Sequence, residues 1–141
     1  MNSNIDRAKY LLNNGAAIAL VRGDDVFSSD RKGIAPLLEF AESNKDLSGF
    51  SAADKIVGKA AALLYCYVGI SEVYANVISR SACSVLSAAG ISFSYDTLAD
   101  YIVNRNGDGM CPMEVAVKDI AEPSQAIHAL RSALNLLLNK K

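Results

Sequence analysis

The chain has almost no excess of charge of either sign and no long apolar run. Its 141 residues carry 14 Lys and Arg against 15 Asp and Glu, a formal net charge of −1. Broad binding to a phosphate backbone needs an excess of basic residues, so the composition argues against nucleic acid as a partner. No apolar run approaches the roughly 20 residues of a membrane span. The stretch from Met1 to Tyr10 also lacks the apolar core of a secretion signal, so we expect a cytoplasmic protein without membrane contact.

Cysteine and histidine are scarce as well. The three cysteines, Cys66, Cys83 and Cys111, are an odd number without paired spacing. This pattern fits free thiols in a reducing compartment better than a disulfide framework. The single histidine, His128, falls in a helical pattern near the end of the chain, where we expect it to be non-catalytic.

What the chain has is enough apolar sequence for a core. Hydrophobic residues make up 51% of it, so we expect one globular domain spanning residues 1–141. Apolar spacing, turn residues and caps predict the elements. In chain order they are a helix at 5–12, a hairpin of 16–22 and 25–29, helices at 34–44 and 51–67, a strand at 73–78, a helix at 79–89, a strand at 91–95, a helical turn at 96–101, a short strand at 102–103, and helices at 113–121 and 124–138.

This order predicts an α/β fold. Helices separate the later strands, which favours a sheet covered on both faces and therefore a three-layer α/β/α sandwich. An all-helical bundle, the main rival, would have to absorb the hairpin and the strand at 73–78, whose alternation is not helical.

The predicted helix at 51–67 begins with polar residues. Ser51 followed by Asp54 has the form of a capping box, in which the acid stabilises the helix start. Lys55 and Lys59 are four apart, so on a helix they would share a face and either hold a phosphate or carboxylate or be solvated. Gly58 inside a helix costs about 1 kcal/mol relative to alanine. It therefore indicates a close approach by another backbone or by a ligand, with close packing the commoner cause.

A second polar stretch, residues 104–114, opens directly into a helix. Its glycines free the backbone for turns, and Pro112 suits a first helical position, so amide groups near Cys111 should point out of the helix start. Arg105 could grip a carboxylate or phosphate, or form a salt bridge with Asp108 or Glu114. Cys111 could be an activated thiol or a small buried residue. Glu114 could cap a helix start or act as a general base.

These two segments, residues 53–62 and 104–114 with Cys111-Pro112-Met113-Glu114, carry a resemblance. They are similar to an uncharacterised bacterial and archaeal family known only as a domain of unknown function with a cytidine-deaminase-like fold. The resemblance extends over nearly the whole chain. It implies a mixed sheet of about five strands between helices.

The resemblance does not imply deaminase chemistry. Zinc deaminases bind their metal with a His or Cys at one helix start and two cysteines at the next. Here the predicted helix start at 53–55 has neither, the one at 79–84 offers only Cys83, and His128 is remote in the sequence. Cys111-Pro112-Met113 lacks a second cysteine. We therefore expect no metal site, no cofactor and no zinc-dependent deamination.

The leading hypothesis is a metal-free protein that binds a small anionic, nucleotide-like ligand between the two polar helix starts. Lysine and arginine side chains would pair with the anion, and loop amides would donate hydrogen bonds to it. The candidate binding residues are Asp54, Lys55, Lys59, Arg105, Asp108, Cys111 and Glu114.

Two alternatives stay open. The first is an enzyme with Cys111 as nucleophile, Arg105 as anion holder, and Glu114 or Asp108 as proton carrier. The second is a structural module that forms a homo-oligomer. Residues 134–138 contain too many apolar side chains in succession for a single buried face, and this supports the second alternative.

Overall fold

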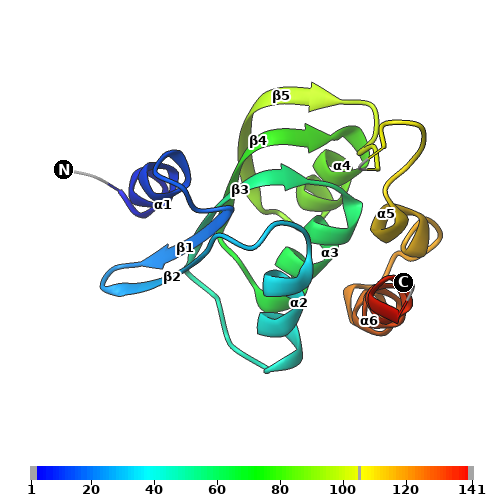
Figure 1. The fold of residues 1–141 in the computed structure, drawn as a ribbon. Coiled ribbons are helices and arrows are strands. Elements are labelled where there is room, and N and C mark those ends of the chain that lie inside the picture. Colours follow the sequence, from blue (N-terminus) through cyan, green and yellow to red (C-terminus); the bar gives the residue numbers. More distant parts are fainter. Residues whose placement is uncertain (1–2, 105, 140–141) are drawn as a thin grey trace.

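The protein is built on one mixed sheet of five strands (Figure 1). A computed structural model describes residues 3–104 and 106–139. The strand order is β2-β1-β3-β4-β5. β1 pairs antiparallel with β2 and β3, whereas β3, β4 and β5 run parallel. The bounds are β1 Ile18–Arg22, β2 Asp25–Ser29, β3 Ser51–Val57, β4 Glu72–Ser79 and β5 Ser92–Ala99.

Helices cover both faces of this sheet, as the sequence predicts. α1 lies alone on one face, while α2, α3 and α4 lie on the other, and α6 packs outside α2 and α3 (Figure 1). None of the helices in the described ranges combines the length and the apolar character needed to cross a membrane. The bounds are α1 Asn4–Asn13, α2 Ala35–Glu42, α3 Lys59–Val68, α4 Arg80–Ala88, α5 Pro112–Ala116 and α6 Pro123–Asn139.

The alternation of side chains along β3 divides the core into two parts. Ala53 packs with α1 in the smaller cluster, and Ala52 packs in the larger cluster between the sheet and α2 to α4. Successive strand residues point to opposite faces, so both alanines are buried. α3 is buried almost all round, from Ala60 to Tyr65, because α6 covers the side that the sheet leaves open.

The predicted helix at 51–67 is wrong in its first part. Ser51–Val57 is a strand, and α3 begins only after Gly58. Ser51 does not cap a helix, since its hydroxyl donates a 2.7 Å hydrogen bond to Glu72. Asp54 is therefore no capping acid, and Lys55 and Lys59 do not share a helix face. The alanines of this segment would be tolerated in a helix or in a strand. Pairing with β1 on one side and β4 on the other makes the segment a strand.

The segment after residue 91 also differs from the prediction. β5 continues through Asp96 to Ala99, so the predicted helical turn at 96–101 is wrong. The predicted strand at 102–103 is a single bridge between Val103 and Met110. The predicted helix at 113–121 is the shorter α5, which ends at Ala116.

Candidate functional site

The start of α3 is held by a carboxylate from a distant part of the chain. Glu114, on α5, accepts hydrogen bonds from the backbone N–H groups of Lys59 and Ala60, each 2.8 Å long. Its two oxygens take one donor each, and the residue is only 8% exposed. The first N–H groups of a helix have no partner within the helix, and the helix dipole favours negative charge there. Glu114 satisfies both requirements at once.

Gly58 provides the space for this contact. A Cβ atom on residue 58 would lie 2.4 to 2.6 Å from the carboxylate atoms of Glu114. Its φ of −100° is ordinary for any residue, so glycine is required for lack of room and not for backbone freedom. A close approach at residue 58 does occur, but Gly58 precedes α3 and does not lie inside a helix, and its neighbour is a side chain, not the backbone or ligand that the sequence suggested.

The loop before α5 positions Glu114. The carbonyl of Cys111 accepts hydrogen bonds from the N–H groups of Glu114 and Val115, at 2.9 and 3.1 Å, which starts α5. Earlier in the loop, Asn104 donates from its side chain to Asp108 at 2.8 Å and accepts from the Asp108 N–H at 3.2 Å. These bonds hold the two ends of the turn together.

The carboxyl group of Asp54 and the phenol of Tyr65 form a second contact, between β3 and α3. Asp54 points from β3 toward α3, where the Tyr65 hydroxyl donates to it at 2.7 Å. Loss of hydration raises the pKa of Asp54 from 3.8 to about 7, although the bond from Tyr65 favours the charged form. Burial, with the negative charge of Asp54, raises the pKa of Tyr65 well above 10, so the phenol stays protonated. The pair can hold or release one proton near neutral pH.

The Asp54 carboxyl should make stability depend on pH. Its pKa is raised in the folded chain, so folding takes up a proton between about pH 4 and about pH 7, and stability falls as pH rises through that interval. In Asp54→Asn this loss of stability disappears. As the pH rises from about 4 to about 7, the free energy of unfolding of the variant should therefore increase relative to that of wild type by on the order of 2 to 4 kcal/mol. Urea unfolding at several pH values measures it, and parallel profiles for the two proteins would contradict it.

Tyr65→Phe is the companion variant. It removes a hydrogen bond that lowers the pKa of Asp54, so its loss of stability should extend to higher pH than that of wild type.

The structure brings together only some of the residues proposed from the sequence. Glu114 contacts the start of α3 at the Lys59 N–H group. The Lys59 ammonium donates a 3.0 Å hydrogen bond to the carbonyl of Lys118, which follows α5 in the chain. Lys55 is exposed, and its N–H bonds the Ala17 carbonyl. The remaining candidates do not join this contact. Asp54 lies earlier on β3, Cys111 starts α5, Asp108 is turned toward Asn104, and Arg105 lies outside the described residues.

Sequence reasoning missed the partner of Asp54, and although it gave helix capping as one role of Glu114, it did not identify α3 as the helix that is capped. Nothing in the sequence pairs Tyr65 with Asp54, because a strand and a helix direct them toward each other. Gly58 is the one signal that pointed to the contact with Glu114. Within residues 3–104 and 106–139, no three His, Cys, Asp or Glu side chains gather closely enough to hold a metal ion.

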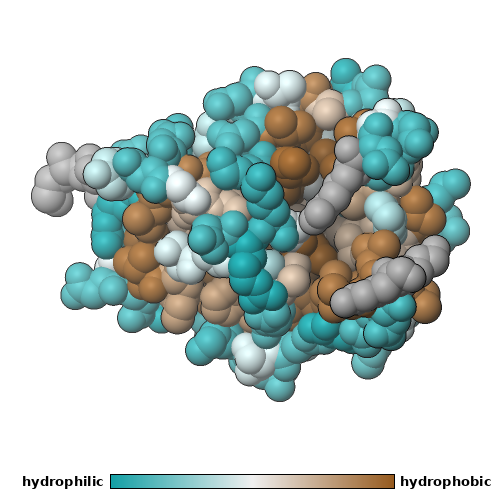
Figure 2. Space-filling view, viewed as in Figure 1, coloured by the Kyte–Doolittle hydropathy of each residue, from teal (hydrophilic) through white to brown (hydrophobic). Residues whose placement is uncertain are grey.

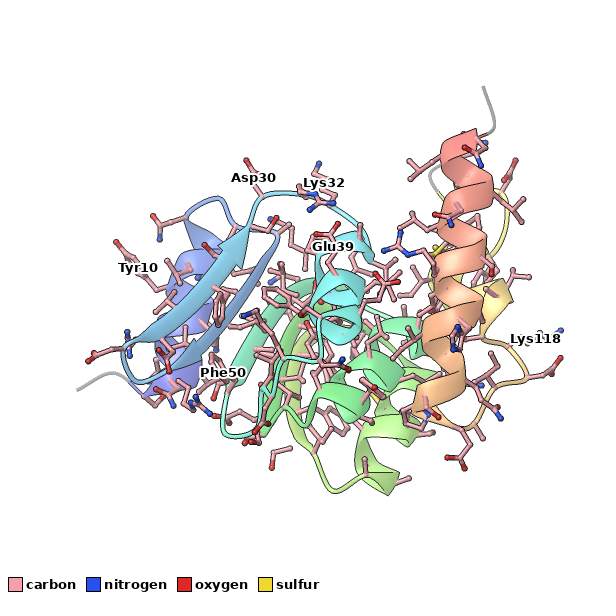
Figure 3. All side chains as sticks on the ribbon, turned by 90° about the horizontal axis from the view of Figure 1, so that it is seen from below. Tyr10, Asp30, Lys32, Glu39, Phe50 and Lys118 are labelled. Atoms are coloured by element: carbon pink, nitrogen blue, oxygen red, sulfur yellow. The ribbon has the colours of Figure 1, made fainter. Side chains whose placement is uncertain are left out.

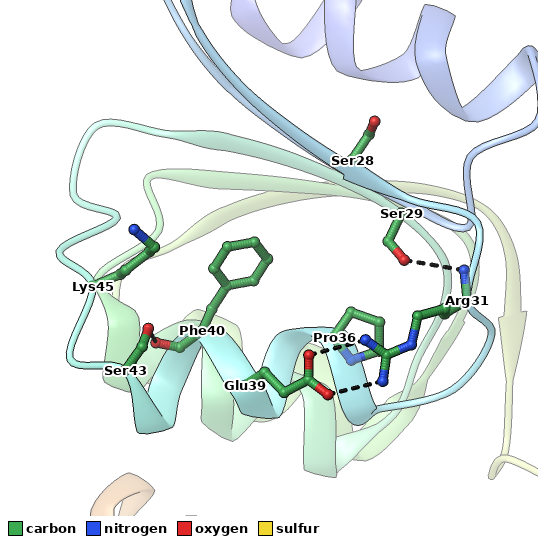
Figure 4. A pocket seen from close by; sticks show the side chains of 8 residues that line it. All are labelled: Ser28, Ser29, Arg31, Pro36, Glu39, Phe40, Ser43 and Lys45. Carbon is green, nitrogen blue, oxygen red and sulfur yellow. Dashed lines mark hydrogen bonds and ion pairs between the residues drawn. The ribbon is translucent and has the colours of Figure 1, made fainter.

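Two hollows flank the hairpin, away from the Glu114 contact. The α2 hollow, of about 400 Å³, lies between β2 and α2, where the Arg31 guanidinium bonds both carboxylate oxygens of Glu39 (Figure 4). The α1 hollow, of about 290 Å³, lies on the other face of the sheet. The α2 hollow is lined by Ser28, Ser29, Arg31, Pro36, Glu39, Phe40, Ser43 and Lys45, and the α1 hollow by Arg7, Tyr10, Leu11, Val21 and Val26.

Comparison with known proteins identifies similar chains. The family described as TM1506, domain of unknown function (DUF1893), matches residues 7–134. The crystal structure of a DUF1893 family protein, TM1506 from Thermotoga maritima, has a TM-score of 0.83 and 29% sequence identity to this chain. The similarity covers 94% of this chain and 91% of that one. Among curated proteins, none matches.

Proposed function

The chain belongs to the DUF1893 family, a domain of unknown function, and we propose that it binds a small anionic, nucleotide-like ligand without a metal. The observation that carries the proposal is the Glu114 carboxylate on the N–H groups of Lys59 and Ala60. Backbone N–H groups at the start of a helix commonly bind the oxygen atoms of a phosphate or a carboxylate. Here the chain supplies its own anion, and a ligand of the same charge would compete with it.

We place this site in a deaminase-type sandwich. Support comes from the strand order and from helices that follow β2, β3 and β4 in turn. A deaminase metal needs His or Cys at two consecutive helix starts. The starts of α2 and α3, residues 34–36 and 58–60, have neither, and the start of α4 has only Cys83. This donor set does not fit a zinc ion.

The position of the site also supports ligand binding. Ligands of open α/β sheets bind at the carboxyl ends of parallel strands. β1 begins at Ile18, opposite Asp54, so Ile56 and Val57 extend beyond it. The carboxyl end of β3, at Ile56 and Val57, therefore lies between Asp54 and the start of α3. Within the described part of the chain, no strand pairs with it on the β1 side.

Anion rescue of Glu114→Ala tests the proposal. Removing the carboxylate leaves two N–H donors and a space, so phosphate and AMP should each raise the melting temperature of the variant by several degrees. Wild type should respond less, because Glu114 competes. Chloride at equal ionic strength controls for screening. Glu122→Ala, at an exposed glutamate after α5, is the matched control. Equal responses of the two variants would contradict anion binding at this helix start.

The Cys111 nucleophile stays a prediction. Its thiol is partly buried against the core, and the backbone carbonyl of the same residue starts α5. No further observation favours it over anion binding.

A further inference from the structure

The α2 hollow is the larger of the two hollows beside the hairpin, and one side of α2 forms its wall. β2 forms the opposite wall. The hollow's volume of about 400 Å³ falls within the range of pockets that hold small molecules. The lining residues of α2 and of its end follow one another at helical positions i, i+3, i+4 and i+7, and they are Pro36, Glu39, Phe40 and Ser43.

Aromatic rings form the centre of the hollow. Phe40 points from α2 into the hollow (Figure 4), and its ring meets that of Phe27 edge to face, with 5.4 Å between the ring centres. Both side chains are only partly buried. A planar apolar group of a ligand would cover the exposed part of these rings and pack against them as aromatic rings pack against one another.

The charges that line the hollow do not cancel. At the end beside Ser29, Arg31 bonds both oxygens of Glu39, and these bonds hold the pKa of Glu39 below its usual value (Figure 4). Lys45 lies at the other end, with its ammonium 5.4 Å from the centre of the Phe27 ring. Within residues 3–104 and 106–139 it has no ion pair. One positive charge of the lining is therefore left without a counter-charge.

We infer that the α2 hollow binds a small aromatic carboxylate, with its ring on Phe40 and its carboxylate on the Lys45 ammonium. A single negative charge matches the one free cation, and the ring matches the aromatic centre. A second carboxylate at the far end of the ligand would face Glu39, so a monocarboxylate is favoured. This site lies beside the hairpin and is separate from the anion site proposed at the start of α3.

Amide NMR titration of the full chain with phenylacetate tests the inference. The signals of Phe40, Ser43 and Lys45 should shift and saturate, with a Kd of about 1 mM. Phenylacetamide, which keeps the ring but not the charge, should bind about fivefold more weakly. Acetate, which keeps the charge but not the ring, should not saturate over the same range. The inference is overturned if phenylacetate gives no saturable shifts, if the acid and its amide bind equally, or if the shifts centre on Lys59 and Ala60.

Lys45→Glu identifies the charge partner. It replaces attraction by repulsion at an exposed position, so the affinity for phenylacetate should fall about tenfold at physiological salt. Lys32→Glu is the matched control, because Lys32 does not line the hollow and points outward from the loop before α2 (Figure 3). Its affinity should stay within about twofold of wild type, since salt screens distant charges. Equal losses in the two variants, or no loss in Lys45→Glu, would contradict the assignment.

The end of α6 controls for adhesion of the aromatic probe to exposed apolar surface. Its last turn exposes Leu136, Leu137 and Leu138, and Figure 2 shows apolar surface around it. It lies on the opposite side of the molecule from the hairpin (Figure 3). The double variant Leu136→Ser with Leu138→Ser should therefore bind phenylacetate like wild type. Loss of binding in this variant would place the probe on α6 and overturn the inference.

Discussion

Gly58→Ala should destabilise the folded chain by about 2 to 4 kcal/mol. The new Cβ cannot lie 2.4 to 2.6 Å from the Glu114 carboxylate, so Glu114 must withdraw and lose its bonds to the α3 start. Hydrogen bonds to a charged group contribute about 1.5 to 3 kcal/mol each. The lower unfolded-state entropy of alanine offsets only about 0.4 to 1 kcal/mol of the loss. Urea unfolding at constant pH measures the difference.

Gly109→Ala is the matched control. Its Cβ would be 3.6 Å from the Asn104 side chain, an ordinary contact, so we expect a small effect. A double-mutant cycle gives the decisive comparison. In the Glu114→Ala background the space beside residue 58 is empty, so Gly58→Ala should cost at least about 2 kcal/mol less than in wild type. An unchanged cost would mean that crowding against Glu114 is not the cause.

Glu114→Ala should destabilise by a similar amount, about 2 to 4 kcal/mol. It leaves the N–H groups of Lys59 and Ala60 without acceptors in a buried place and removes negative charge from a helix start. Thermal and urea unfolding measure the loss, and hydrogen exchange at Lys59 and Ala60 should accelerate. A variant as stable as Glu122→Ala would show that the carboxylate does not stabilise α3.

Glu114→Gln separates charge from shape. The amide keeps the size of the side chain, but it offers one oxygen acceptor and turns an N–H₂ donor toward a backbone N–H. One hydrogen bond is lost and two donors face each other. We expect a loss close to that of the alanine variant. A loss near zero would mean that packing, rather than the charged acceptor, holds the two segments together.

Where a segment's conformation follows from its own residues, the sequence predicted it. The turn at 23–24 between two apolar runs is a hairpin, and α1, α2, α4 and α6 follow the helical spacing of their apolar residues. A sheet with helices on both faces follows from the order of these elements, whereas the mixed sheet of about five strands was implied only by the family resemblance, and its central strand β3 was predicted as a helix. Each of these features depends on local geometry and on the burial of one apolar face.

Tertiary contacts decided the rest. Residues 51–57 suit a helix or a strand, and only pairing with β1 and β4 makes them a strand. Gly58 and Glu114 could each be singled out in the sequence, but their contact joins segments 55 residues apart at the Lys59 amide. The raised pKa of Asp54 likewise arises only where β3 and α3 enclose it. Hydrogen bonding and desolvation between distant segments depend on where the chain brings them, and local sequence pattern does not contain that information.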